Sequence, residues 1–135
     1  MTKLERRIFT LSNLLVSIIG LVYFIYKYFF KNETEFGLRP HEYTSTFLHL
    51  HIITVPILLI CFGYLLSKHI IPKLTKGNSQ RKLSGISLLV LFFLMTLSGY
   101  LLQMAFENTQ YVEISHLGFS FIWIFIYLWH FRMKI

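Results

Sequence analysis

Four long apolar segments constrain this chain more than any other feature of its sequence. A helix needs about 20 apolar residues to cross the hydrocarbon core of a bilayer. Lipid offers no partner to bare backbone groups, so a segment that spans it must be helical. We therefore expect an all-α membrane protein in which residues 1–135 form a single domain, an antiparallel bundle of four transmembrane helices. The expected helices are approximately 8–30, 44–71, 83–106 and 111–131.

Composition excludes several other classes of protein. Only 14% of the residues are charged and 55% are hydrophobic, whereas a soluble domain has roughly 25% charged residues. The single cysteine, Cys61, leaves no disulfide framework and no CxxCH motif for covalent c-type haem. The net charge of +7 lies at the ends of the apolar segments. Membrane lipid is therefore an expected partner, and nucleic acid is not.

The distribution of charge predicts an orientation. Basic residues gather at both termini and between the second and third apolar segments. The opposite side carries five of the six acidic residues, which are Glu33, Glu35, Glu42, Glu107 and Glu113. By the positive-inside rule, both termini are expected to be cytoplasmic.

Two prolines bear on the second expected helix. The segment Arg39-Pro40-His41-Glu42 is typical of a helix start, with proline at the first position and an acid in the first turn. It predicts that this helix begins near Pro40 and projects beyond the membrane. Pro56 lies inside the apolar segment and predicts a kink there.

Histidines give the main functional signal, because histidine is costly inside a membrane and marks function there. All of them lie on or near the second and fourth expected helices, at His41, His49, His51, His69, His116 and His130.

Helical spacing groups four of these histidines into two pairs. His116 and His130 are 14 residues apart, so they share a face and lie about 21 Å apart along the axis. His51 and His69 are 18 residues apart, which is five whole turns of a regular helix. His49 lies on the opposite side from His69, so we prefer His51, but a bulge at the proline would leave His49 as an alternative.

We expect His51 and His116 to form an outer pair, and His69 and His130 an inner pair. Two imidazoles on facing helices are what bis-histidine ligation of haem iron requires. Gly85 and Gly99 on the third expected helix are also 14 residues apart, and glycine lets a flat ring approach the backbone closely.

These features resemble the di-haem four-helix core of membrane b-type cytochromes, such as the cytochrome b of quinol–cytochrome c oxidoreductases. In that family the second and fourth helices each carry two haem-ligating histidines, and the first and third carry glycines. The segment from His116 to His130 matches the family spacing, and Gly85 and Gly99 are similar to its glycine pair. The segment Leu97-Ser-Gly-Tyr-Leu-Leu also resembles small bacterial cytochrome b-like membrane domains.

The resemblance implies two non-covalent haem b groups and a role in electron transfer across a bacterial inner membrane. The partners would be a quinone or an inner-side redox protein and an outer c-type cytochrome or iron–sulfur protein. The chain would then be an electron-transfer subunit of a larger oxidoreductase. It departs from the family in its wider histidine spacing on the second helix, its lack of paired glycines on the first and its lack of the Pro-Glu-Trp-Tyr motif. The implied haem-binding residues are His51, His116, His69 and His130, with His49 as an alternative, and Gly85 and Gly99.

Two other functions stay open. A non-redox scaffold or assembly subunit would use the histidines for hydrogen bonds between helices. A small transporter would use them in a proton relay, but no apolar segment carries an acid at mid-depth. The confinement of histidine to two parallel helices favours haem over both.

Overall fold

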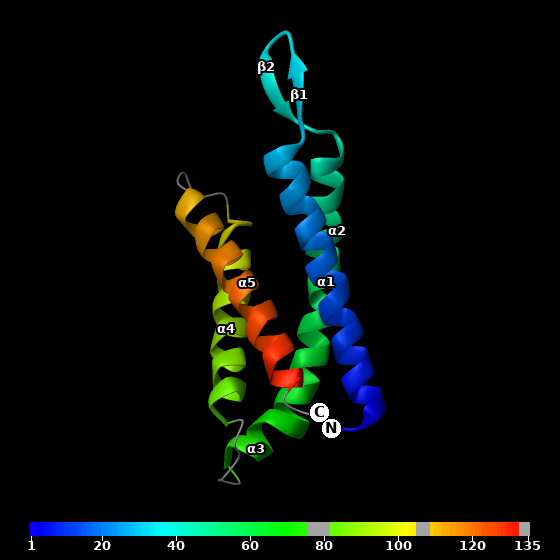
Figure 1. The fold of residues 1–135 in the computed structure, drawn as a ribbon, viewed down its shortest axis with the longest axis vertical. Coiled ribbons are helices and arrows are strands. Elements are labelled where there is room, and N and C mark those ends of the chain that lie inside the picture. Colours follow the sequence, from blue (N-terminus) through cyan, green and yellow to red (C-terminus); the bar gives the residue numbers. More distant parts are fainter. Residues whose placement is uncertain (76–81, 105–108, 133–135) are drawn as a thin grey trace. The chain divides into compact units, whose positions relative to one another are not determined.

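The chain folds into two compact units, Met1–Pro72 and Lys73–Ile135, each built on a pair of long helices (Figure 1). The computed structural model describes residues 1–75, 82–104 and 109–132. Within these residues, four helices are long and apolar enough to cross a membrane, as the sequence predicted. The sequence predicts connections at 72–82 and 107–110, of which residues 76–81 and 107–108 lie outside the described residues.

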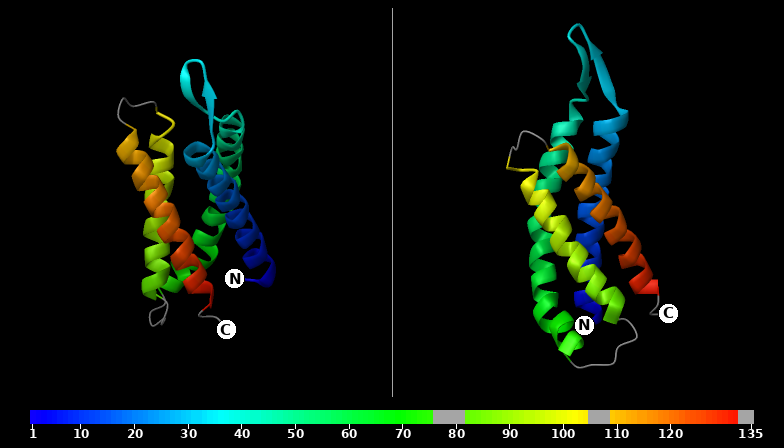
Figure 2. Two further views of the ribbon diagram at one scale, coloured as in Figure 1. Left: turned by 45° about the horizontal axis from the view of Figure 1, so that its top comes forward. Right: turned by 90° about the vertical axis from the view of Figure 1, so that its left-hand side faces the viewer.

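Unit 1 consists of two antiparallel helices joined by a β-hairpin. Tyr64, near the end of the second helix, donates a hydrogen bond of 3.0 Å to Glu5, near the start of the first. Figures 1 and 2 show the two helices side by side. Its elements are α1 (Lys3–Phe29), β1 (Lys31–Thr34), β2 (Gly37–Pro40), α2 (Tyr43–Leu65) and the π-helical turn η1 (Leu66–Ile70). The short helix α3 (Ile71–Thr75) begins in unit 1 and ends in unit 2.

Helix α1 begins five residues before the expected Ile8, because a capping box closes its first turn. The Glu5 N–H donates to the Thr2 hydroxyl at 3.2 Å, and the Thr2 N–H donates to the Glu5 carboxylate at 2.7 Å. This reciprocal pair satisfies two amides that a helix start leaves without partners. The Thr-x-x-Glu pattern could have shown this start from the sequence.

The connection between α1 and α2 is a hairpin rather than the helix start predicted at Arg39–Glu42. Arg39 pairs with Asn32, and Thr34 pairs with Gly37, across two exposed antiparallel strands. Gly37 has a φ of 97°, which glycine adopts without the steric cost of a Cβ. Helix α2 therefore starts at Tyr43 and not near Pro40.

Helix α2 continues through Pro56, and its regular hydrogen-bond pattern is interrupted further on, at η1. There the Ile71 N–H donates to the Leu66 carbonyl, five residues earlier. A π turn encloses one more residue than an α turn. The five-turn relation between His51 and His69 was calculated for a regular helix, and this extra residue breaks it.

Unit 2 is the antiparallel pair α4 (Lys82–Leu101) and α5 (Gln110–Arg132). Helix α4 ends before the expected Phe106, which itself lies outside the described residues. The N–H groups of Gln103 and Met104 donate to carbonyls only three residues back, so the α-helical ladder gives way to a tighter turn.

Each unit has a small apolar core between its helices. In unit 1, the rings of Phe9 on α1 and Phe62 on α2 are both buried, with centroids 6.4 Å apart. In unit 2, the buried Trp123 of α5 lies 5.4 Å from Phe92 of α4 and stacks on Tyr127 at 6.1 Å. These aromatic contacts fix which face of each helix meets its neighbour.

Large apolar side chains are exposed along the long helices. On α1, Leu4, Leu11 and Ile18 follow one another at intervals of seven residues and are 67%, 66% and 58% exposed. The same spacing recurs at Ile53 and Ile60 on α2 and at Leu83, Val90 and Leu97 on α4. Seven residues are close to two turns, so each set forms a stripe on one face. Soluble monomers rarely expose stripes of this extent, whereas they suit helices surrounded by lipid.

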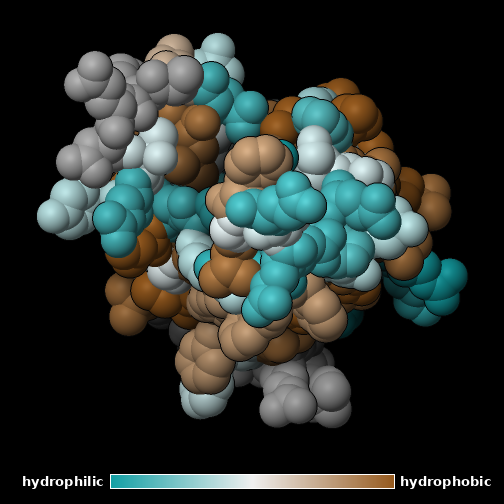
Figure 3. Space-filling view, turned by 90° about the horizontal axis from the view of Figure 1, so that it is seen from above, coloured by the Kyte–Doolittle hydropathy of each residue, from teal (hydrophilic) through white to brown (hydrophobic). Residues whose placement is uncertain are grey.

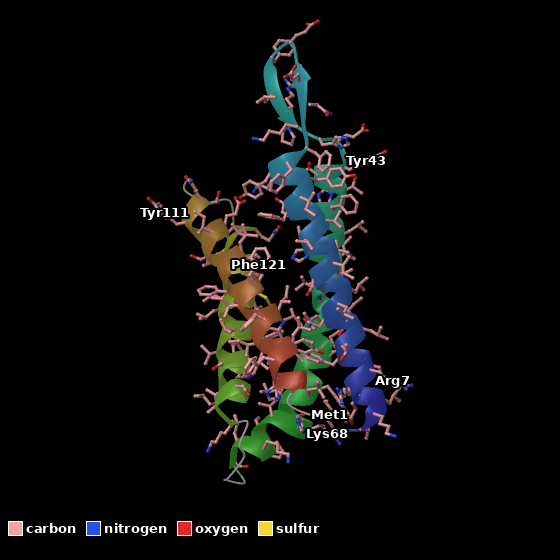
Figure 4. The ribbon with its side chains drawn as sticks, viewed as in Figure 1. Met1, Arg7, Tyr43, Lys68, Tyr111 and Phe121 are labelled. Atoms are coloured by element: carbon pink, nitrogen blue, oxygen red, sulfur yellow. The ribbon has the colours of Figure 1, made fainter. Side chains whose placement is uncertain are left out.

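Polar groups gather at the ends of unit 1. Figure 4 labels Tyr43 at the hairpin end, and Arg7 and Lys68 at the opposite end. Viewed from the hairpin end, Figure 3 shows a group of hydrophilic side chains facing the viewer. This division into apolar helix sides and polar ends is typical of a membrane helix pair.

Candidate functional site

In unit 1, His51 of α2 packs directly against α1. Its Nδ1 lies 3.2 Å from the Val16 carbonyl oxygen. Its ring also covers Gly20, where an added Cβ would lie 2.8 Å from the histidine Cε1 and 3.0 Å from Nδ1. No side chain larger than hydrogen fits at Gly20 with the imidazole in this position.

In unit 2, His116 of α5 makes the corresponding contacts with α4. Its Nδ1 lies 3.0 Å from the Met95 carbonyl oxygen. An added Cβ at Gly99 would lie 2.9 Å from the His116 Cε1 and 3.3 Å from Nδ1. The two units therefore hold a histidine in the same way, although their sequences show no clear repeat.

The shared arrangement follows from helix geometry. In both cases the glycine comes four residues after the residue that offers its carbonyl, as in Val16 with Gly20 and Met95 with Gly99. Residues four apart lie on the same helix face. The carbonyl has two lone pairs and uses one within its own helix, so it can accept a second hydrogen bond from the imidazole.

The carbonyl contacts also determine which ring nitrogen carries the proton. A carbonyl oxygen can only accept, so the Nδ1 of His51 and of His116 must be the N–H donor. In the neutral imidazole the lone pair is then on Nε2. Metal-binding histidines commonly show this pattern, donating one N–H to a backbone carbonyl while the other nitrogen binds the metal.

A serine adds a second contact to His116. The buried Ser98 hydroxyl donates to the Leu94 and Met95 carbonyls at 2.8 and 3.0 Å, and its oxygen lies 3.2 Å from the His116 Nδ1. The oxygen can accept from the same N–H that points at Met95. This shared hydrogen bond further restricts rotation of the ring.

The second histidine of α5, His130, also faces α4. Its Nδ1 lies 2.8 Å from the Ser84 hydroxyl, so both histidines of α5 lie on the face that meets α4. The 14-residue spacing predicted this shared face, and their pairing with the histidines of the second helix stays a prediction. A hydroxyl both donates and accepts, so this contact does not determine the tautomer of His130.

The other histidines differ from these three. His49 is exposed on α2, while His51, two residues on, packs on α1. His69 is half-buried within η1. His41 lies in an aromatic group at the hairpin end, 5.2 Å from the ring centroids of both Tyr26 and Tyr43.

Two glycines make contacts with histidine rings that the sequence did not predict. Within unit 2, Gly99 lies against the imidazole ring of His116, and its expected role of making room for a porphyrin stays a prediction. Gly85 has no atom within 4 Å of its potential Cβ position. From the sequence, Gly20 is a mid-span glycine on the first helix where a large ring could approach the backbone. Its contact with His51 has no spacing signal and is seen only in the structure.

Comparisons with known proteins offer no relative. No family model matches the chain, and no similar protein was found among the curated proteins or the solved structures. Within the described ranges, no group of three or more His, Cys, Asp or Glu side chains could hold a metal ion. Axial ligation of a haem needs only two histidines.

Proposed function

We propose that this protein is a membrane-inserted b-type cytochrome subunit that binds two haems and conducts electrons across the membrane. The observation that carries the proposal is the shared setting of His51 and His116, each of which donates from Nδ1 to a helix carbonyl. Each unit would contribute one neutral imidazole, through Nε2, to the outer haem.

For the inner haem, we propose His130 and His69 as the axial ligands. The Ser84 contact restrains the ring of His130, as Ser98 does for His116. His69 would come from the π turn, a feature often found at functional sites. The inner pair therefore lacks the matched contacts of the outer pair, because His69 lies in a π turn.

Bound haem would supply reversible one-electron chemistry, and the chain's own residues would tune it. Hydrogen bonds to the ligand imidazoles raise their basicity, and an apolar surround lowers the local dielectric. The exposed apolar stripes on α1, α2 and α4 support insertion into lipid. We further propose that the basic ends of the chain, with both termini, face the cytoplasm of a bacterial cell.

The chain would act with redox partners, because each unit consists almost entirely of apolar helices. We propose an outer c-type cytochrome or iron–sulfur protein, and a quinone or redox protein on the inner side. No residue of the chain is assigned to a quinone.

A structural scaffold is the second candidate function. The His51 and His116 contacts are hydrogen bonds between helices, and such bonds also stabilise membrane proteins without any cofactor. The scaffold needs the Nδ1 contacts alone, whereas the haem proposal also needs Nε2 to bind iron.

A reduced-minus-oxidised absorbance spectrum, with haem counted per chain, separates the two functions. We expect two b-type haems in protein produced with ample haem. His51→Ala and His116→Ala should each lose one haem, whereas His49→Ala, at an exposed position on the same helix, should keep both. Absence of haem from protein purified with its partners would leave the scaffold as the function. A single haem, lost on substitution of His51 or His116, would retain the outer site and reject the transmembrane path.

A further inference from the structure

A hollow of about 440 Å³ opens at the hairpin end of unit 1, the end that Tyr43 marks in Figure 4. It lies between the last turns of α1 and the first turns of α2. It is open rather than enclosed, and its volume suffices for part of a larger ligand. The lining residues are Tyr23, Lys27, Pro40, His41, Glu42, Thr44, Ser45 and Leu48.

The polar side chains of this hollow can donate hydrogen bonds, with the exception of the Glu42 carboxylate. Lys27 lines the hollow, and its ammonium lies 5.8 Å from the ring centroid of Tyr23 and 5.7 Å from that of Tyr28. The Nδ1 of His41 accepts the Tyr43 N–H at 3.3 Å, which leaves Nε2 as the protonated nitrogen of the neutral ring. Among these lining residues, all in the described part of the chain, Glu42 alone is acidic.

The hydroxyl of Thr44 is the main indication that the hollow binds a ligand. Its hydroxyl oxygen is buried and has no hydrogen-bond partner among the described residues. A buried hydroxyl without a partner costs free energy, and native proteins rarely leave one unsatisfied. An oxygen of a bound group would satisfy it, and Lys27 would favour an oxygen that carries negative charge.

The position of the hollow indicates where that group comes from. Thr44 precedes His51 by seven residues and Lys27 follows Gly20 by seven, so the hollow lies about 10.5 Å further along both helices. That is the end of the apolar part of unit 1. Tyrosines cluster there, as they do at the headgroup level of a membrane, with Tyr26 5.2 Å from His41 and 6.1 Å from Tyr43.

We propose that this hollow binds the phosphate of a phospholipid headgroup, with Lys27 supplying charge and Thr44 and Ser45 supplying hydroxyl donors. The lipid tails would then run along the exposed apolar sides of α1 and α2. The proposal rests on the membrane insertion proposed above and does not require haem.

Native mass spectrometry of the full chain in detergent, titrated with phosphatidylglycerol, tests the proposal. We expect one tightly retained lipid per chain. Thr44→Val and Lys27→Gln should each weaken retention about tenfold, because each removes a hydrogen bond to a charged group. Lys31→Gln is the matched control, since Lys31 is an exposed lysine on β1 outside the hollow, and it should bind like the wild type.

Two further measurements keep this test decisive. Without lipid, Thr44→Val should unfold at the same temperature as the wild type or higher, because it removes an unsatisfied buried hydroxyl. The double variant His51→Ala, His116→Ala removes the proposed outer haem ligands and should retain lipid unchanged. A chain that binds haem but retains no lipid would overturn this inference and leave the proposed function standing.

Other outcomes would overturn the proposal in favour of different ligands. Equal lipid retention by the wild type, Thr44→Val and Lys27→Gln would show that the hollow is not the lipid site. Thr44-dependent binding of inorganic phosphate, with no lipid retained, would indicate a soluble anion. Loss of haem from both variants with lipid retention unchanged would indicate a haem carboxylate in the hollow.

Discussion

The two helical units hold one histidine alike and differ at the opposite end of each helix pair. His51 and His116 each donate to a carbonyl and cover a glycine four residues after it. Toward the start of the first helix, unit 2 has the Ser84–His130 contact, whereas unit 1 has a hydrogen bond between Tyr64 and Glu5.

The comparison distinguishes contacts that orient a histidine ring from a contact that only joins two helices. In both units a carbonyl and a glycine on one helix face contact the imidazole, and in unit 2 Ser98 adds a further contact. The Tyr64–Glu5 bond joins α1 to α2 at an exposed position and orients no histidine. In unit 1, the second histidine of the pair, His69, lies within the π turn η1. The proposed outer and inner haem sites would therefore differ in how firmly their histidines are oriented.

The largest expected loss of stability comes from replacing Gly20 and Gly99 by alanine. Gly20→Ala and Gly99→Ala would each push an imidazole away, and overpacking of this kind costs about 1–3 kcal/mol. Gly63→Ala is the matched control on α2, because its Cβ would meet nothing within 4 Å. That change should stabilise the helix by about 0.5–1 kcal/mol. The free energy of unfolding in detergent and the haem content would measure both. Equal effects at Gly20 and Gly63 would refute the role of the His51 contact.

A smaller effect is expected from the two serines of α4. Ser84→Ala removes a hydrogen-bond partner of His130 and should cost about 1 kcal/mol. Ser98→Ala should cost less, because the Met95 carbonyl still accepts from His116. Unfolding free energies of the two variants provide the comparison. A larger loss for Ser98→Ala would show that the serine, and not the carbonyl, holds His116.

A substitution in the hairpin, an element described only in unit 1, should destabilise the hairpin without destabilising the helices. Gly37→Ala places a Cβ on a residue with a φ of 97°, which costs about 1 kcal/mol. Because both strands are exposed, hydrogen exchange of the hairpin amides should speed up while the helix amides stay protected. Faster exchange throughout α1 and α2 would show instead that the hairpin stabilises the helix pair.

The smallest effect is expected at Tyr64. Tyr64→Phe removes the hydrogen bond to Glu5, but both groups are accessible to water, which can replace it. The thermal unfolding midpoint and the haem content should equal those of the wild type. A loss of haem from this variant would give Tyr64 a role like that of His130 and remove the contrast between the units.

Much of the fold could be predicted from the sequence, because long apolar segments and helical periodicity are local properties. The four long helices and the shared face of His116 and His130 follow from them. The capping box at Thr2 and Glu5 was also readable. The hairpin was not predicted, because Pro40 after a basic residue reads equally well as a helix start. In the structure Pro40 ends strand β2, where it pairs with Lys31, and does not begin a helix.

The candidate site was predicted only in part. The spacing singled out His51 and His116, yet left His49 open and linked His51 to His69 through a regular helix. The π turn removes that link, and no periodicity in the sequence predicts where such a turn falls. The roles of Gly20 and Gly99 as contacts for imidazoles were invisible, because they depend on which residue of the neighbouring helix lies opposite.

The sequence by itself determined the number of long apolar helices, the placement of charge at their ends and the histidines on the second and fourth of them. Each of these depends on neighbouring residues along one chain segment. Tertiary structure alone decided that His51 meets Val16 and Gly20, and that His116 meets Met95 and Gly99. The physical reason is that the periodicity of a helix fixes only its own faces. The register between two helices comes from packing across them, here through aromatic cores and close contacts at glycine.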